Sequence, residues 1–106
     1  MANTYVNAKL DLTATSVTVL YTCAALTTGL VKSILVSEDS GNADTITLTL
    51  TTGSTVFSLF KVKAVGANGT IELLTQPLVV QPGEILKVTA ATANRLHVVA
   101  SILEVT

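Results

Sequence analysis

The feature that most constrains this chain is the strict alternation of residues 45–51, which read Thr-Ile-Thr-Leu-Thr-Leu-Thr. Successive side chains of a β-strand point to opposite faces, so Ile46, Leu48 and Leu50 share one face and the threonines share the other. An α-helix would spread the same three apolar side chains around its circumference. The segment therefore predicts a strand with one apolar face and one hydroxyl-bearing face.

Similar patterns recur along the chain. In residues 16–23 the alternation groups Val17, Val19, Tyr21 and Cys23 on one face. Residues 30–37 are apolar on both faces apart from Lys32 and Ser33, which is typical of a central strand or of a strand that faces a partner. The predicted strands cover residues 5–12, 16–23, 30–37, 45–51, 55–63, 70–74, 78–80, 84–90 and 96–105.

Turn residues separate these segments. The tripeptide 52–54 (Thr-Gly-Ser) and the Asn68-Gly69 pair are typical of hairpin turns, and Pro82-Gly83 fits a type II turn. Strands at this spacing predict an all-β, antiparallel β-sandwich of about eight or nine short strands. Its topology is expected to be a jelly roll or immunoglobulin-like, and residues 1–106 are expected to form one domain.

The low charge content indicates self-association or another protein partner. Only 12% of the 106 residues are charged, and a domain of this size exposes much of its surface. Some apolar area is therefore expected to be covered by other chains, including further copies of this one. The net charge is −1 and the cations are scattered from Lys9 to Arg95, so binding to nucleic acid is not expected.

The expected contact elements are the N-terminal segment 1–9, the apolar segment 30–36 and the threonine face of residues 45–51. The threonine face has two interpretations, a packing surface for another subunit or the ordinary hydrated face of an antiparallel sheet, and both stay open. The predicted interface residues are Tyr5, Leu30, Lys32, Ile34, Val36, Thr45, Thr47 and Thr49.

No catalytic, metal or cofactor site is predicted. The single histidine, His97, has no nucleophile or orienting carboxylate assigned to it by a motif, and Cys23 is expected to be an inert buried thiol. The acidic segment 38–44 offers oxygen ligands for Ca²⁺, but a solvated loop is the favoured interpretation because the EF-hand pattern is missing. One cysteine, no signal-peptide pattern and no membrane-spanning apolar run predict a protein of the reducing cytoplasm.

The segments 12–22, 31–37, 45–51, 68–74, 77–89 and 99–105 together resemble a group of small virion structural proteins of tailed bacteriophages, common in cyanophages and other marine phages. The resemblance covers nearly the full length of the chain. It implies a non-enzymatic subunit of a virus particle, located in the virion and assembled in the host cytoplasm. It implies no catalytic residues.

The resulting expectation is a capsid cement or decoration protein, which forms homo-oligomers and binds the major capsid protein. A tail, neck or fibre component of the same particle is the alternative. A carbohydrate-binding module is an alternative from another class, because β-sandwiches often bind sugars, although the chain has only two tyrosines and two phenylalanines.

Overall fold

Residues 2–106, which the computed structural model describes, form nine β-strands and no helix. The prediction of an all-β antiparallel sandwich is confirmed. The predicted strands match the observed ones to within a few residues at each end, and residues 78–80 and 96–105 match in full. The strands are β1 (Asn3–Asp11), β2 (Thr18–Thr22), β3 (Thr28–Glu38), β4 (Asp44–Thr52), β5 (Thr55–Val65), β6 (Thr70–Glu72), β7 (Leu78–Val80), β8 (Ile85–Ala90) and β9 (Leu96–Val105).

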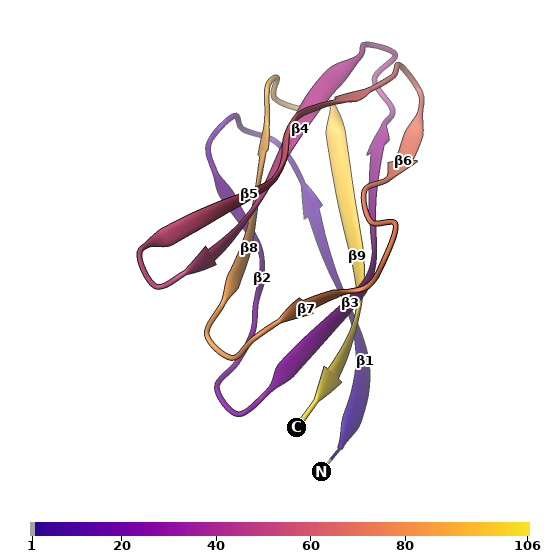
Figure 1. Cartoon of the computed structure of the whole chain (residues 1–106). Coiled ribbons are helices and arrows are strands. Elements are labelled where there is room, and N and C mark those ends of the chain that lie inside the picture. The colour runs from indigo at the N-terminus through magenta and orange to yellow at the C-terminus, as the bar shows by residue number, and fades with distance from the viewer. Residues whose placement is uncertain (1) are drawn as a thin grey trace.

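The strands form two antiparallel sheets (Figure 1). In sheet A, β9 lies between β1 and β3, and both β6 and β7 pair with the other edge of β3. Sheet B has the order β2-β8-β4-β5. If β6 and β7 are counted as one interrupted strand, this is the eight-stranded order of a jelly roll. An immunoglobulin-like sandwich would place β1 and β2 in one sheet, whereas here they lie in different sheets.

The core lies between the two sheets. Ile46 and Leu48, which the alternation of β4 places on its apolar face, are fully buried. Burying such a side chain contributes about 1.5–3 kcal/mol to stability. Sheet A supplies the facing side chains, and the largest other fully buried apolar residues are Leu12, Ile34, Leu86, Leu96 and Ile102.

A β-bulge in β2 changes which side chains face this core. The pairing of β2 with β8 shifts between Val19 and Tyr21, so Leu20 and Tyr21 are both buried while Val17 and Val19 are exposed. The prediction that Val17, Val19 and Tyr21 share one face is therefore wrong. The inserted residue interrupts the period of two on which that prediction depended.

Two carboxylate contacts tie distant segments together. The Tyr21 hydroxyl in sheet B donates a hydrogen bond to Oε2 of Glu104 in sheet A, at 2.6 Å. Glu38, at the end of β3, is 1% exposed and accepts hydrogen bonds from the backbone N–H groups of Ser40, Gly41, Asn42 and Asn68 and from the Ser40 hydroxyl. The Glu38 carboxylate thus holds the β3–β4 loop against the β5–β6 loop.

Candidate interaction surfaces

The outer face of sheet A carries a row of apolar side chains that crosses four strands. The register pairs Tyr5 with Leu103, Leu103 with Leu30, and Leu30 with Val79. Their neighbours Val31 and Ile102 point into the core, so the alternation directs the four row residues outward. Tyr5 is 74% exposed and Val79 is 46% exposed. We call these four residues, Tyr5, Leu30, Val79 and Leu103, the apolar row.

Further apolar side chains extend this face. Val99 in β9 pairs with Leu35 in β3, and both are exposed. Lys32 places its Nζ 5.9 Å from the centroid of the Tyr5 ring, a cation–π geometry. The outer face of sheet A therefore presents several apolar groups next to a small number of charges, which is the composition expected of a protein contact surface.

Three of the predicted interface residues from the segments 1–9 and 30–36 lie on this face, namely Tyr5, Leu30 and Lys32. Ile34 and Val36 do not, because each is 0% exposed and packs in the core between the sheets. Their inclusion as surface contacts is wrong. The pairing of β3 with β9 shifts between Val31 and Ser33, and this bulge decides which residues of the apolar segment face inward.

The threonine face lies on the outer side of sheet B. Thr45, Thr47 and Thr49 are half-buried, and Thr47 pairs with Thr89 in β8. The Thr47 hydroxyl accepts a hydrogen bond from the Val62 backbone N–H in β5, at 3.1 Å. The Thr47 hydroxyl thus makes a hydrogen bond within sheet B itself. The role of the threonine face as a contact surface stays a prediction.

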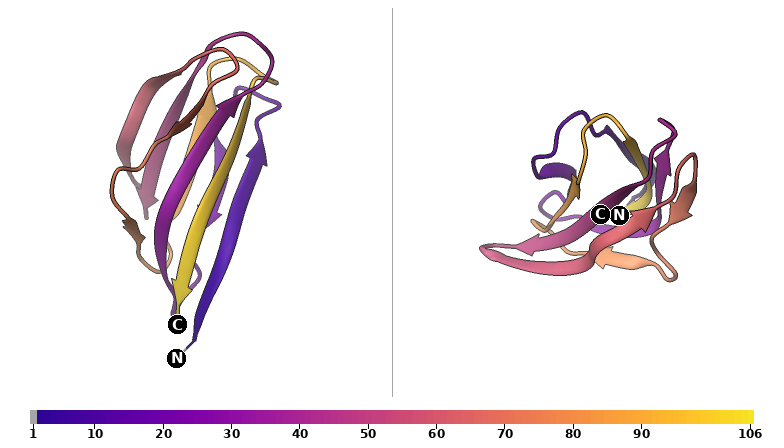
Figure 2. Two further views of the ribbon diagram at one scale, coloured as in Figure 1. Left: turned by 90° about the vertical axis from the view of Figure 1, so that its right-hand side faces the viewer. Right: turned by 90° about the horizontal axis from the view of Figure 1, so that it is seen from above.

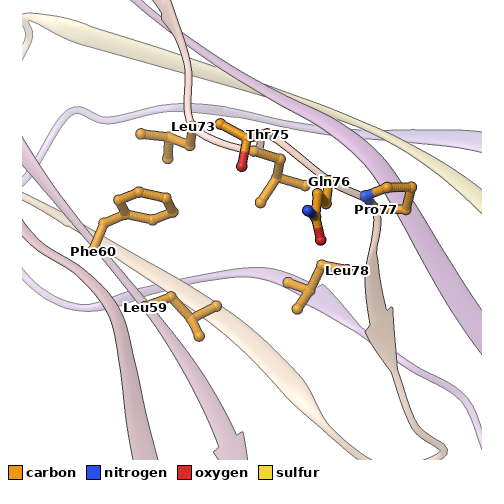
Figure 3. Close-up of a pocket in the computed structure, with 8 residues that line it drawn as sticks. Leu59, Phe60, Leu73, Thr75, Gln76, Pro77 and Leu78 are labelled. Atoms are coloured by element: carbon orange, nitrogen blue, oxygen red, sulfur yellow. The ribbon is translucent and has the colours of Figure 1, made fainter.

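A groove opens where β5 passes the segment that joins β6 to β7. Its volume is about 300 Å³. Figure 3 shows Leu59 and Phe60 on one side of it and Leu73, Pro77 and Leu78 on the other. The groove exists because β6 and β7 are only three residues long and leave this side of the sandwich incompletely covered. Sequence reasoning misses this groove, because its walls come from separate segments and residues 75–77 carry no strand pattern.

Asp11, His97 and Ser37 lie next to one another on three neighbouring strands, because the register pairs Asp11 with His97 and His97 with Ser37. The Nε2 atom of His97 lies 3.2 Å from Asp11 Oδ1, and its Nδ1 atom lies 3.6 Å from Asp39 Oδ2. In a Ser-His-Asp hydrolase one ring nitrogen faces the carboxylate and the other accepts the serine proton. Here both nitrogens face carboxylates, which is not the geometry of such a triad.

The other residues considered for chemistry have structural contacts. Cys23 is buried and its thiol donates to the Thr27 carbonyl at 3.1 Å. Asp44 accepts a hydrogen bond from the Thr92 backbone N–H, so the carboxylates of Glu38, Asp39 and Asp44 point to different partners. Among residues 2–106, no cluster of three or more histidine, cysteine, aspartate or glutamate side chains is arranged to hold a metal ion.

Comparison with known protein families gives no match to this chain, and comparison with curated proteins gives none either. No segment within residues 2–106 forms a helix of the length and apolarity that crossing a membrane requires. The apolar row, the threonine face and the groove are therefore the basis on which a function can be argued.

Proposed function

We propose that this protein is a structural, non-enzymatic subunit of a tailed-bacteriophage particle, and that it acts as a decoration or cement protein on the capsid. The resemblance of its sequence segments to small virion proteins supports this assignment. The strand order supports it too, because jelly rolls are a recurrent architecture of viral capsid proteins, although lectins and cupins also use them. Fold alone does not assign a function, and more specific support comes from the surface of the protein.

The observation that carries the proposal is the apolar row on the outer face of sheet A. An isolated chain would leave Tyr5 and Val79 in contact with water, together with Leu35 and Val99 beside them. Contact with the major capsid protein would bury these side chains and stabilise the complex in proportion to the apolar area removed from water. Repetition of this contact over the lattice would hold neighbouring capsid subunits together even if each single contact is weak.

The test is occupancy of the capsid by a variant with a charge in the apolar row. Val79→Lys should reduce binding to particles that lack the protein by roughly tenfold or more, since the contact would bury an unpaired ammonium group. Val56→Lys is the matched control, because Val56 is exposed on the edge strand of sheet B and lies outside the row. Equal binding of the two variants would contradict a contact through sheet A.

Copy number separates the capsid role from the alternative within the same particle. Quantitative mass spectrometry of intact particles should find hundreds of copies if the protein decorates the capsid. About a dozen copies or fewer would assign it to the tail, neck or a fibre instead, and absence from the particle would refute both roles.

Binding to a carbohydrate is the competing class of function, and the exposure of two aromatic side chains is the observation that favours testing it. Phe57 is 51% exposed, so the surface has two exposed aromatic side chains, Phe57 and Tyr5. They lie on different sheets, Tyr5 in β1 and Phe57 in β5, and so do not form one aromatic platform. A glycan array with specific hits that Phe57→Ala removes would favour this class over the structural role.

A further inference from the structure

Two-sheet sandwiches have free edges, and most edges of this one carry features that discourage pairing with another strand. β6 and β7 have three residues each, and β2 is short and contains a bulge. β5 is long, but its register with β4 shifts twice, Val62 has a positive φ of 53°, and Lys61 and Lys63 flank that residue. Short edges, bulges and edge lysines are the devices by which proteins prevent edge-to-edge association.

The edge formed by β1 differs from these. It pairs with β9 in nine consecutive residue pairs without a register shift, from Asn3 with Val105 to Asp11 with His97. It contains no proline, and Lys9 is its only cation. Figure 2, left, shows β1 as the outermost strand of sheet A, with no other strand beyond it. β1 is thus the long, regular edge that another strand can extend.

The hydrogen bonds that flank β1 show which of its backbone groups point to the free edge. The Ala2 carbonyl accepts from the Thr106 N–H, and the Leu12 N–H donates to the Leu96 carbonyl. Even-numbered residues therefore bond to β9, and odd-numbered residues direct their N–H and C=O groups away from it. The free groups are the N–H and C=O of Asn3, Tyr5, Asn7 and Lys9 and the N–H of Asp11, whose carbonyl accepts from Thr13.

We propose that β1 is a self-association seam, at which β1 of a second copy pairs antiparallel about a two-fold axis at Asn7. An interface of this kind uses the same surface on both chains. With the axis at Asn7, every odd-numbered residue of β1 faces an odd-numbered residue of the other copy. All of the outward-pointing backbone groups except the Asn3 N–H, which faces the Asp11 carbonyl that already accepts from Thr13, then find free partners, and sheet A continues through the seam into the second molecule.

The side chains of β1 complement one another in this register. Tyr5 of each copy faces Lys9 of the other, and Asn3 faces Asp11, so a cation meets an aromatic ring and an amide meets a carboxylate. Asn7 faces its own symmetry mate, and no like charges are opposed. On the inner side Val6 faces Ala8, which continues the apolar layer.

Other registers are less favourable. An axis at Ala8 leaves Asn3 without a partner and places Asp11 opposite Tyr5. An axis at Lys9 opposes the two lysines directly, and like charges across strands are destabilising. The pairing about Asn7 is thus selected both by the number of backbone hydrogen bonds and by charge.

Disulfide trapping tests the register. Residues of a hydrogen-bonded antiparallel pair have Cα atoms about 5.5 Å apart, which suits a disulfide. Asn7→Cys should therefore give a covalent dimer on mild oxidation, while the buried Cys23 stays unreacted. Asn3→Cys is the control from the same strand and face, because in this register its two copies lie eight residues, or about 27 Å, apart. Comparable trapping at both positions would overturn the proposal.

A charge exchange tests the same contact without covalent chemistry. Tyr5→Lys puts two lysine pairs across the seam and should abolish the dimer seen by sedimentation, and the double variant Tyr5→Lys/Lys9→Glu should restore it. Circular dichroism checks that all variants are folded. A wild-type chain that stays monomeric at millimolar concentration, or a Tyr5→Lys chain that still dimerises, would refute the seam.

The seam goes beyond the proposed capsid role and does not depend on it. Self-association is measured on the isolated protein, whereas the capsid role is measured on particles through Val79. A dimer that forms in solution while Val79→Lys leaves capsid binding intact would retain the seam and reject the capsid contact.

Discussion

At the scale of single residues, Glu38 has the most consequential environment. Burial alone would raise the pKa of this carboxyl group, but hydrogen bonds from Ser40, Asn68 and Gly41 to its charged form outweigh that effect and lower the pKa to about 2. Sequence reasoning places Glu38 in a solvated acidic loop. Nothing in the order of residues 38–44 reveals that a backbone N–H from residue 68, across another hairpin, reaches the same carboxylate.

We expect Glu38→Gln to lower the melting temperature by roughly 10 °C. The amide has one acceptor oxygen in place of two, so some of the converging N–H groups of Ser40, Gly41, Asn42 and Asn68 lose their partner. Differential scanning calorimetry at neutral pH measures the effect. Asp39→Asn in the same loop is the control, and an equally large loss there would contradict the special role of Glu38.

The same contacts predict a pH dependence. The pKa of Glu38 is lower in the folded chain, at about 2, than its ordinary value of 4.5. The folded state therefore binds fewer protons, and the contribution of Glu38 to stability is complete above pH 4.5 and is lost as the pH falls toward 2. Urea unfolding of the wild type and of Glu38→Gln should give a stability difference that shrinks through this window. A difference that stays constant from about pH 6 to about pH 2 would contradict the assigned pKa.

At the scale of the strands, the sequence predicts where strands lie much better than which way their side chains point. The alternation of β4 is regular, and Ile46 and Leu48 are buried as predicted. Bulges in β2 and β3 each insert one residue and reverse the facing of the residues beyond it, so periodicity alone puts Val19 and Ile34 in the wrong environment. The position of a bulge depends on the partner strand, which sequence periodicity does not contain.

The candidate interaction surface is likewise only partly predictable from the sequence. Tyr5, Leu30 and Lys32 can be chosen from the sequence because they are large or charged residues in strand segments. The continuous apolar row cannot, because it depends on a register that brings β1, β9, β3 and β7 together. The contact of His97 with Asp11 and Asp39 is hidden for the same reason.

The positive φ of Val62 in β5 predicts an effect on stability. Val62 has a φ of 53°, a left-handed conformation that is costly for a β-branched side chain and easier for asparagine. Val62→Asn should raise the free energy of unfolding by about 1 kcal/mol. Val56→Asn is the matched control, because Val56 lies in the same strand with the same exposed fraction of 60% but without the positive φ.

The control should be neutral or slightly destabilised, since asparagine has a low β-propensity. Urea unfolding midpoints of the two variants measure the difference. If both substitutions shift the midpoint in the same direction and by the same amount, the strain assigned to Val62 is absent.

At the scale of the whole molecule, the jelly-roll order brings the two ends of the chain together. The Thr106 backbone N–H donates to the Ala2 carbonyl at 3.0 Å, and Figure 1 shows both termini at one end of the sandwich. The β4–β5 hairpin projects away from the rest of the molecule in Figure 1 and in the right-hand view of Figure 2. Its turn residue Gly53 has open space around it.

These placements predict that the chain tolerates circular permutation at one loop and not at another. A short glycine-serine linker between residues 106 and 2 closes a gap that is already bridged by a hydrogen bond, so new termini at residues 53 and 54 should leave the fold intact. New termini at residues 40 and 41 should be strongly destabilising, because the cut removes the constraint that holds two N–H donors on the Glu38 carboxylate. Thermal unfolding followed by circular dichroism compares the two permutants. If the second permutant were as stable as the first, the hydrogen bonds to Glu38 would contribute little to the stability of the fold. The first permutant also tests the seam, because the linker leaves no free N-terminus beside β1. If the free edge of β1 makes the contact, this permutant should still dimerise.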